Sequence, residues 1–204
     1  MNKDVQIIDV GIGNIASVFN MLKRIGANPS LTTNPEKISA GSKLILPGVG
    51  AFDAGIVALR KFGIEEAVCE ASRRGVYILG ICLGMQLLFG RSEEGDLPGL
   101  GLINGHVDRI KPKGKSIKIP HMGWNVIRPV QNSSLFSLNA EEQRFYFVHS
   151  YHAVCDNPSD VTALVNHGYD FTCAVQRENI FGVQFHPEKS HRFGMSLLKK
   201  FIEL

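Results

Sequence analysis

The stretch Val76-Tyr77-Ile78-Leu79-Gly80-Ile81-Cys82-Leu83-Gly84-Met85-Gln86-Leu87-Leu88-Phe89-Gly90 decides the fold of this chain. It begins with β-branched, aromatic and aliphatic residues, which predict a buried strand. It turns at Gly80-Ile81-Cys82-Leu83-Gly84 and continues as a short helix from Leu83 to Phe89. A strand, a tight turn and a helix, with a nucleophilic side chain between two glycines, form a nucleophile elbow, here with cysteine in place of serine. The glycines are needed because a Cβ beside the nucleophile would collide with the strand or the helix.

Such an elbow would place the Cys82 sulfur at the carboxyl edge of the sheet and at the N-terminus of a helix. There the backbone N–H groups and the helix dipole favour a thiolate over a thiol. The N–H of Leu83 would point toward an oxyanion formed beside the sulfur. Alternatively, Cys82 is a small buried apolar residue at a strand end, as most free cysteines are. The elbow alone does not separate these two interpretations.

The residues before the elbow predict three further strands in a repeating strand–helix order. The strands are Val5–Val10, Pro29–Thr33 and Lys43–Leu46, with a helix after Asn14 that ends near Gly26 and helical sequence from Asp53 to Arg74 that is broken at Gly63. This order is typical of a parallel, doubly wound, flavodoxin-like α/β sheet with helices on both faces. Sites in such sheets lie at the carboxyl ends of the strands. The turns at residues 11–14 and 47–50 would therefore face one crevice together with Cys82.

From Gly99 onward, short strands separated by Pro and Gly turns replace the strand–helix order. We expect strands at Leu100–Asp108, Ile117–Ile119, Trp124–Ile127, Phe145–Ser150, Val161–Val165, Thr172–Gln176 and Ile180–Phe185. A final helix, Phe193–Glu203, would turn Leu197, Leu198 and Phe201 toward the core. No linker or repeat interrupts the sequence. We predict that this half is an antiparallel extension of the same open, twisted, mostly parallel sheet, and that residues 1–204 form a single domain.

The composition is that of an ordinary globular chain. Of its 204 residues, 44% are hydrophobic and 20% are charged, and the net charge is +3, with no basic stripe that would favour nucleic-acid binding. The first residues lack the pattern of a signal peptide, and no apolar run reaches the length of a membrane span. The four cysteines show no C-x-x-C spacing. Free thiols in a reducing compartment are the expectation, which places the protein in the cytoplasm.

A cysteine nucleophile needs a base, and the base needs a group that holds its tautomer. His186 ends the apolar strand Ile180–Phe185 and precedes Pro187, so it would project at the same carboxyl edge as Cys82. Glu188 can turn back and accept a hydrogen bond from the second ring nitrogen. We therefore predict Cys82, His186 and Glu188 as nucleophile, base and orienting group. A metal site at His186 and Glu188 is the weaker interpretation, because no further ligand has a usable spacing. Four other histidines lie in polar or turn-like sequence and are expected at the surface: His106, His152, His167 and His191.

Two further features suit an acyl-transfer site. In the turn Pro47-Gly48-Val49-Gly50, the Val49–Gly50 peptide could aim a second N–H at the oxyanion, although a plain strand-to-helix turn explains the same residues. Gln86 lies one turn after Cys82 and shares its helix face. An amide among leucine, methionine and phenylalanine suits substrate binding better than core packing.

Three segments together resemble the class I (triad) glutamine amidotransferases. They are the elbow at residues 80–86, the turn at residues 47–50 and the closing Gln184-Phe185-His186-Pro187-Glu188. Further segments are similar to one subfamily, the glutaminase subunits of imidazole glycerol phosphate synthase: Pro120-His121-Met122-Gly123-Trp124-Asn125, Tyr146-Phe147-Val148-His149-Ser150-Tyr151 and Phe185-His186-Pro187-Glu188-Lys189-Ser190. The resemblance extends over nearly the whole chain.

The resemblance implies a reaction and its residues. Cys82 would attack the carboxamide of glutamine, the N–H of Leu83 and the Val49–Gly50 peptide would form the oxyanion hole, and His186, oriented by Glu188, would carry the proton. Four residues match positions that hold glutamine in this family: Gln86, Glu93, Ser150 and Tyr151. The ammonia would pass to a separate (βα)8-barrel synthase subunit, in a heterodimer that makes imidazole glycerol phosphate and an aminoimidazole carboxamide ribotide. No metal or organic cofactor is implied.

The run His121-Met122-Gly123-Trp124-Asn125 has two interpretations. A lone tryptophan is usually part of the core. The run, however, mixes too many polar groups for a core, and the resemblance assigns it to the surface that faces the partner. The residues expected at this interface are Asn14, His121, Met122, Trp124, Asn125 and Lys189.

Three alternative functions remain open at the level of sequence. A paralogous glutaminase could supply ammonia for amidination of a bacterial surface sugar, and its active-site residues would be the same. A dinucleotide-binding protein is suggested by Gly11-x-Gly13-x-x-Ala16, but the strand Pro29–Thr33 ends in threonines where a ribose-binding acid is needed. A non-catalytic interaction subunit would have no need for the intact set of Cys82, His186 and Glu188.

Overall fold

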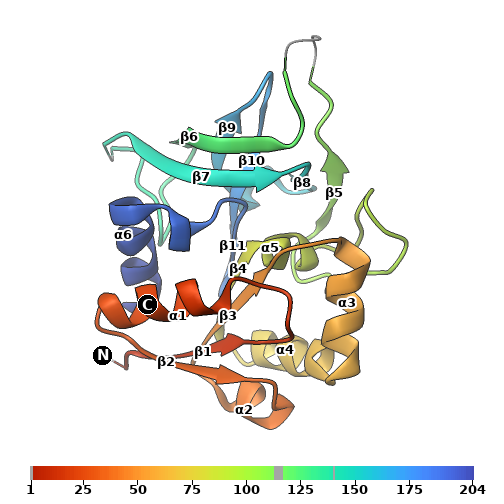
Figure 1. Cartoon of the computed structure of the whole chain (residues 1–204), viewed down its shortest axis with the longest axis vertical. Coiled ribbons are helices and arrows are strands. Elements are labelled where there is room, and N and C mark those ends of the chain that lie inside the picture. Colours follow the sequence, from red (N-terminus) through yellow and green to blue (C-terminus); the bar gives the residue numbers. More distant parts are fainter. Residues whose placement is uncertain (1, 113–116, 140) are drawn as a thin grey trace.

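The computed structural model, which describes residues 2–112, 117–139 and 141–204, contains one continuous mixed sheet with helices on both of its faces (Figure 1). Half of the sheet is parallel, in the order β2-β1-β3-β4-β11. Its strands are β1 (Asp4–Ile8), β2 (Asn28–Thr32), β3 (Lys43–Gly48), β4 (Tyr77–Cys82) and β11 (Ile180–Val183). The chain thus enters the parallel half again near its end, and this return places β11 directly beside β4.

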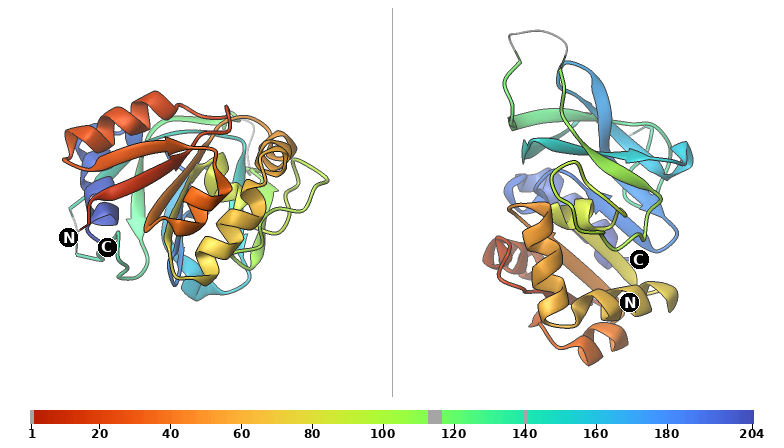
Figure 2. Two further views of the ribbon diagram at one scale, coloured as in Figure 1. Left: turned by 90° about the horizontal axis from the view of Figure 1, so that it is seen from below. Right: turned by 90° about the vertical axis from the view of Figure 1, so that its right-hand side faces the viewer.

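The second half of the sheet is antiparallel and continues from β11 in the order β10-β9-β6-β7, with β8 joined to β10 and β5 joined to β8. Its strands are β5 (Gly105–Arg109), β6 (His121–Pro129), β7 (Gln143–His149), β8 (Tyr151–Cys155), β9 (Val161–Asn166) and β10 (Asp170–Arg177). Figure 2 shows this part at the opposite end of the molecule from β2, with the two chain termini near each other. The fold is the expected open α/β sheet with an antiparallel extension.

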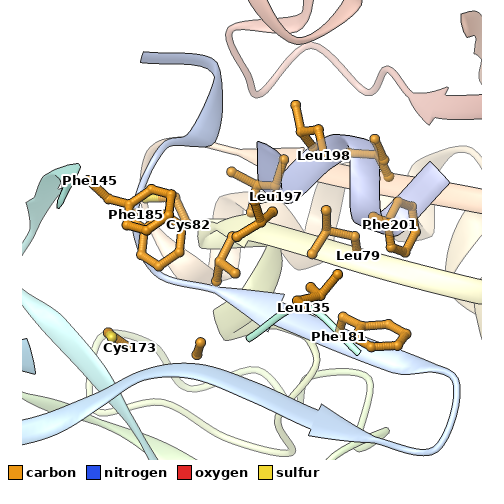
Figure 3. Packing of buried hydrophobic residues seen from close by; sticks show 14 of the residues in the cluster. Leu79, Cys82, Leu135, Phe145, Cys173, Phe181, Phe185, Leu197, Leu198 and Phe201 are labelled. Carbon is orange, nitrogen blue, oxygen red and sulfur yellow. The ribbon is translucent and has the colours of Figure 1, made fainter. Parts of the chain in front are cut away.

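Two groups of helices bury the two faces of the sheet. Helices α1 (Ile15–Arg24) and α6 (His191–Ile202) share one hydrophobic cluster with the sheet, and α2 (Pro35–Ala40), α3 (Phe52–Lys61), α4 (Ile64–Arg73) and α5 (Leu83–Leu87) share the other. In the first cluster, Leu197, Leu198 and Phe201 of α6 lie over Leu79 of β4 and Phe181 of β11 (Figure 3). The central strands that carry the elbow are therefore covered on both faces, which holds the turn rigidly.

Most of the expected elements are confirmed. The helical sequence after residue 52 breaks at Gly63, which adopts a left-handed conformation with φ of 64°. The final helix turns Leu197, Leu198 and Phe201 into the core as expected. No helix among the described residues has the length and apolar character needed to cross a membrane.

The expected strand at Leu100–Asp108 is wrong in its first half, because only Gly105–Arg109 is extended and paired. The backbone N–H groups of Leu100 and Leu102 donate instead to the carbonyls of Leu87 and Leu88, at 2.9 and 2.8 Å. These carbonyls lie at the C-terminal end of α5, where helical partners are lacking. The segment thus satisfies the end of the elbow helix rather than extending the sheet.

Three other expectations at the level of elements need correction. Residues Ile117–Ile119 form no strand, and the carbonyl of Lys118 accepts a hydrogen bond from the ring of His167 instead. Strand β8 was not expected, because only one residue separates it from the end of β7 and no Gly or Pro marks the turn. Helix α2 was also missed, although Asn34 accepts from the N–H of Glu36 and proline occupies the first helical position, which is a helix-start signal.

Candidate active site

Cys82 lies at the junction of β4 and α5 and has a positive φ of 55°. Residues other than glycine rarely adopt such a backbone conformation, and the strain it carries is often found at functional turns. Glycine is required on either side. A Cβ at Gly84 would collide with the carbonyl oxygen of Leu46, and a Cβ at Gly80 would lie 2.6 Å from the carbonyl oxygen of Gly84. The close approach of α5 to both β3 and β4 thus explains the glycines of the elbow.

The register of β11 beside β4 brings His186 to the elbow. Val183 pairs with Ile81, which is one residue before Cys82. His186 follows Val183 by three residues, so it lies just past the end of β11, near Cys82. The backbone N–H of His186 donates to the carbonyl of Tyr146 on β7 at 2.9 Å. This bond fixes the backbone of His186 between the parallel and the antiparallel halves of the sheet.

His186 and Glu188 form a buried pair. Nδ1 of His186 lies 2.8 Å from Oε1 of Glu188, and both side chains are only 2% exposed. Because a carboxylate only accepts, the proton sits on Nδ1, and Nε2 remains for proton exchange. Nε2 makes no hydrogen bond within the described part of the chain. Burial by itself would lower the pKa of His186, but its interactions with Cys82 and Glu188 outweigh burial and raise the pKa to about 9.

A cavity of about 310 Å³ opens in front of Cys82 and His186. Its wall contains most of the residues that the sequence predicted for substrate and oxyanion binding: Val49, Gly50, Leu83, Gln86, Ser150 and Tyr151. It also contains four residues not predicted for this role: Glu94, Pro120, Val148 and His149. A larger crevice of about 690 Å³ lies at the opposite ends of β1 to β3 and includes Asp4, Gln6 and Lys43, but neither a cysteine nor a histidine of the described ranges lines it. Of the two, the smaller cavity has the groups for acyl transfer.

The predicted substrate residue Glu93 does not line this cavity, and Glu94 does. The carboxylate of Glu93 accepts from the backbone N–H of Arg109 at 2.7 Å and from Nζ of Lys111 at 2.8 Å. These bonds hold the side chain away from the cavity and lower the pKa of Glu93. The neighbouring Glu94 accepts from the N–H of Phe52 at 2.9 Å, and burial raises its pKa. The assignment of Glu93 to the substrate is corrected accordingly.

The turn predicted to supply a second oxyanion donor is fixed by a hydrogen bond beside the Val49–Gly50 peptide, whose own N–H belongs to Gly50. The N–H of Val49 donates to the carbonyl of Ile12 at 2.8 Å, in the loop that precedes α1. Gly50, which follows, has a φ of 107°, a conformation that favours glycine. One N–H group of the turn at residues 47–50 is therefore engaged by Ile12 and does not point into the cavity as a free donor.

Only part of the run from residue 121 to 125 is exposed. The side chains of Met122 and Trp124 are 62% and 45% exposed, and the Trp124 ring stacks on His191 at a centroid distance of 5.5 Å. Lys189 is also exposed, with its Nζ over the ring of Tyr146. His121, in contrast, is 3% exposed, so its predicted contact with a partner through the side chain is wrong. The remaining interface candidates, Asn14 and Asn125, are half-buried.

The histidines on β6, β7 and β8 form an aromatic cluster next to the cavity. The surface position expected for His152 is wrong, because this residue is buried and stacks on Phe171. His121 stacks on Phe147, and the buried His149 forms part of the cavity wall. The alternation of buried side chains at positions 145, 147 and 149 of β7 is a signal that the sequence offered. Within the described residues, no group of three His, Cys, Asp or Glu side chains is arranged to hold a metal ion.

The glycine-rich turn at residues 11–14 is hydrogen-bonded to the turn at residues 47–50. Gly11 adopts a φ of 79°, and its N–H donates to the side chain of Asp9. The next residue, Ile12, holds the oxyanion turn through its carbonyl. The turn thus contacts the active-site loop, which accounts for its glycines without a bound dinucleotide.

Comparison with known proteins gives the same picture across the whole chain. The family model for class-I glutamine amidotransferases matches residues 6–204. The imidazole glycerol phosphate synthase subunit HisH 2 of Pseudomonas aeruginosa is 50% identical over 201 residues, which covers 98% of this chain and 99% of that protein. The subunit HisH 2 of Methanococcus maripaludis is 46% identical, with 98% of each chain covered. HisH of Bdellovibrio bacteriovorus is 44% identical, with coverage of 98% and 100%.

Solved structures show the same fold at lower sequence identity. A glutamine amidotransferase crystal structure superposes with a TM-score of 0.76 at 19% identity and covers 98% of this chain and 97% of that one. The PurLQS structure from Thermotoga maritima has a TM-score of 0.76 at 22% identity, with coverage of 100% and 99%. At this identity, the likeness concerns the fold alone.

Proposed function

Since this chain belongs to the class-I glutamine amidotransferases and, within them, to the HisH subunits of imidazole glycerol phosphate synthase, we propose that it hydrolyses glutamine at Cys82 and delivers the ammonia to a (βα)8-barrel synthase subunit. The observation that supports this most strongly is the buried His186–Glu188 pair beside the elbow. The synthase would use the ammonia to form imidazole glycerol phosphate and an aminoimidazole carboxamide ribotide. We propose that residues 1–204 act as one domain in the cytoplasm.

In the proposed mechanism, the thiol proton of Cys82 moves to Nε2 of His186. A raised pKa of about 9 favours this imidazolium at neutral pH. The proton transfer leaves a thiolate as the attacking group, beside a cation. The sulfur forms a bond to the carboxamide carbon of glutamine, and the carbonyl electrons move to oxygen, where the N–H of Leu83 donates. His186 then protonates the amide nitrogen, the C–N bond breaks, and ammonia leaves a glutamyl thioester on Cys82.

The second half of the reaction reverses the role of the base. Neutral His186 takes a proton from water, and the hydroxide oxygen adds to the thioester carbon. When the tetrahedral intermediate collapses, the C–S bond breaks and the sulfur takes the proton back from His186. Glutamate is released and Cys82 is regenerated, so the cycle consumes one water per glutamine and needs no cofactor.

The pKa of His186 predicts an alkaline limit to activity. Above pH 9, neutral His186 can no longer protonate the departing ammonia, so kcat at saturating glutamine should be level near neutral pH and fall above about pH 9. In Glu188→Gln, loss of the carboxylate that raises this pKa should move the limit to lower pH. The measurement is kcat against pH for both proteins, with ammonia-dependent synthesis as the control for stability. If kcat of Glu188→Gln fell at the same pH as kcat of the wild type, the assignment of the alkaline limit to His186 would be contradicted.

Glu94 is expected to bind the α-ammonium group of glutamine, because it supplies the carboxylate in the described cavity wall. Glu94→Gln keeps an oxygen that can accept from Phe52 and removes only the charge. It should raise KM for glutamine by roughly 10-fold or more, the usual effect of losing a hydrogen bond to a charged group. The matched control is Glu93→Gln, whose side chain lies outside the wall and should leave KM nearly unchanged. Equal effects of the two substitutions would refute the choice of Glu94.

The partner is expected to control the rate, because the turn at residues 47–50 is held by Ile12. We expect the turn to contribute its second oxyanion donor fully only after the partner repositions it, and one such donor is typically worth about 10²–10³-fold in kcat. We therefore expect glutamate release by the purified chain to rise by roughly that factor when a histidine-pathway barrel synthase and its ribonucleotide substrate are added. Full activity of the free chain would contradict the need for a partner.

The same experiment tests the pathway. Stimulation by the histidine-pathway synthase supports the proposed acceptor. Cys82-dependent glutaminase activity that ignores this synthase but responds to a barrel partner from a surface-sugar pathway would overturn the acceptor and keep the chemistry. Saturation of Trp124 fluorescence quenching by NAD would instead support the dinucleotide alternative.

A further inference from the structure

Gln184 occupies a position that the mechanism above does not use. It follows β11, two residues before His186, and its side chain is completely buried. Its Nε2 lies 3.7 Å from Sγ of Cys82, within hydrogen-bonding reach of a sulfur atom, and its Oε1 accepts from Nε2 of Gln86 at 3.0 Å. Since the two ends of a primary amide have the same shape, only its partners decide which end faces the sulfur.

A backbone carbonyl decides this orientation. Nε2 of Gln86 lies 3.3 Å from the carbonyl oxygen of Tyr151, which can only accept a hydrogen bond. The amino end of Gln86 must therefore face both Tyr151 and Gln184. Gln184 must in turn present its oxygen to Gln86, and its N–H group then points at Cys82.

The same carbonyl of Tyr151 ends a second chain of hydrogen bonds, which begins on β6. Nδ1 of His149 lies 2.7 Å from this carbonyl oxygen, and Nε2 of His149 lies 2.9 Å from Nδ1 of His121. Nε2 of His121 lies 3.0 Å from Nδ2 of Asn125, which also donates to the carbonyl of Asn166 at 2.8 Å. Backbone carbonyls therefore anchor this chain at both of its ends.

The directions of these bonds follow from the charge of the two histidines. Burial lowers the pKa of His149 to about 3, and burial together with the nearby His167 lowers the pKa of His121 to about 4. Both rings are neutral near pH 7, so each carries one proton. The Tyr151 carbonyl requires that proton on Nδ1 of His149. Its Nε2 must then accept from Nδ1 of His121, whose own Nε2 accepts from Asn125.

We propose that Gln184 is a positioning residue that directs its amide N–H at the sulfur of Cys82, and that the Tyr151 carbonyl sets its orientation through Gln86. The chain of hydrogen bonds from Asn125 through His121 and His149 ends on the same carbonyl. The donor holds the sulfur toward the cavity and compensates negative charge on it during attack and thioester breakdown. An oxygen in the same place would repel the sulfur. This inference rests on the proposed function for its kinetic consequences only.

Two substitutions separate a donor from a packing residue. Gln184→Met keeps the length of the side chain and removes the donor, and Gln184→Glu keeps the shape and places oxygen beside the sulfur. Both should lower kcat for glutamine hydrolysis in the complex by about 10-fold or more, with KM changed less than about 2-fold. Both should also slow alkylation of Cys82 by iodoacetamide in the free chain, followed by peptide mapping. If kcat and the alkylation rate of both variants equalled the wild-type values, the proposed role of Gln184 would be overturned.

The matched control is Thr162→Val on β9. Thr162 is 2% exposed, its hydroxyl makes no hydrogen bond within the described part of the chain, and it lies outside the cavity wall. The substitution changes a buried polar group without touching the chain of bonds, so kcat and alkylation should stay at wild-type values. Thermal unfolding of all three variants shows whether each is folded.

The hydrogen-bond directions can be tested in the wild-type protein, so this part does not depend on any variant that fails to fold. Nitrogen-15 NMR of the imidazole rings should find both His121 and His149 in the Nδ1–H tautomer near pH 7. In Asn125→Asp, the new oxygen requires a proton on Nε2 of His121, so its resonances should change to the Nε2–H or the doubly protonated form. The neighbouring Met122→Ala should leave both rings unchanged. Nε2–H tautomers in the wild-type protein would overturn the chain.

The outcomes keep the two proposals distinct. Absence of Cys82-dependent glutamate release from the wild-type complex would overturn the proposed function, while alkylation rates and tautomers would still test the inference. Normal Cys82-dependent turnover in the wild type, with unchanged kcat and alkylation in Gln184→Met and Gln184→Glu, would overturn the inference alone.

Discussion

Cys82→Ala is expected to abolish glutamine-dependent synthesis by the complex while leaving ammonia-dependent synthesis intact. The substitution removes the sulfur that forms the thioester and leaves the oxyanion donors and the cavity in place. Loss of a covalent nucleophile typically reduces turnover by on the order of 10⁴-fold or more. The ammonia-dependent reaction takes place in the partner and needs no nucleophile in this chain. Product formation from glutamine and from an ammonium salt, measured with the same enzyme preparation, checks both halves of the expectation.

A second cysteine provides the control for this experiment. Cys69 is half-buried on α4, away from the cavity wall, so Cys69→Ala should retain both activities. If Cys82→Ala also lost ammonia-dependent synthesis while the complex remained assembled, the two reactions would not be divided between the subunits as proposed. If the variant kept glutamine-dependent turnover, the nucleophile would be a different group.

The sequence predicted the nucleophile elbow and its base because both depend on local patterns. The glycines of the elbow, the apolar strand before His186 and the two-residue spacing to Glu188 are short-range signals. The parallel register of β11 beside β4 then brings Cys82 and His186 to one edge. Strand–helix order does not predict this register, because β11 follows β10 in an antiparallel hairpin and no crossover helix precedes it.

The sequence alone could not show which of two adjacent glutamates lines the cavity. Glu93 and Glu94 lie in one turn, where the N–H of Glu94 donates to the hydroxyl of Ser92. Which carboxylate enters the cavity depends on Lys111 and Arg109, which hold Glu93 from β5 and the residues after it. These partners come from 16 and 18 residues further along the chain, so no local pattern contains the information.

The burial of the histidines was missed for a related reason. His152 was judged by its polar neighbours in the sequence, and His121 was assigned to the interface by the resemblance, although His121 and His149 are paired across β6 and β7. Burial of the neutral imidazoles is possible there because every ring nitrogen has a partner: the two rings bond to each other across β6 and β7, His149 donates to the Tyr151 carbonyl, and His121 accepts from Asn125. Cross-strand partners are set by sheet pairing, which a single strand cannot reveal.

Gly84→Ala is expected to destabilise the protein strongly, by roughly 3 kcal/mol or more. The added Cβ would collide with the carbonyl oxygen of Leu46, which belongs to the backbone of β3 and cannot rotate away as a side chain would. Relief requires α5 to move from β3, and this movement would displace Leu83 and the elbow together. The free energy of unfolding, measured in urea for the wild type and the variant, checks the expected loss.

Gly90→Ala is the matched control, since a Cβ at Gly90 meets no atom within 4 Å and the residue does not have a positive φ. The same chemical change, six residues further along, should alter the free energy of unfolding by no more than about 0.5 kcal/mol. A stable Gly84→Ala variant with normal glutamine turnover would mean that the turn tolerates a wider separation of β3 and α5. The close packing of the elbow would then be incidental to its chemistry, and the strain at Cys82 would need another cause.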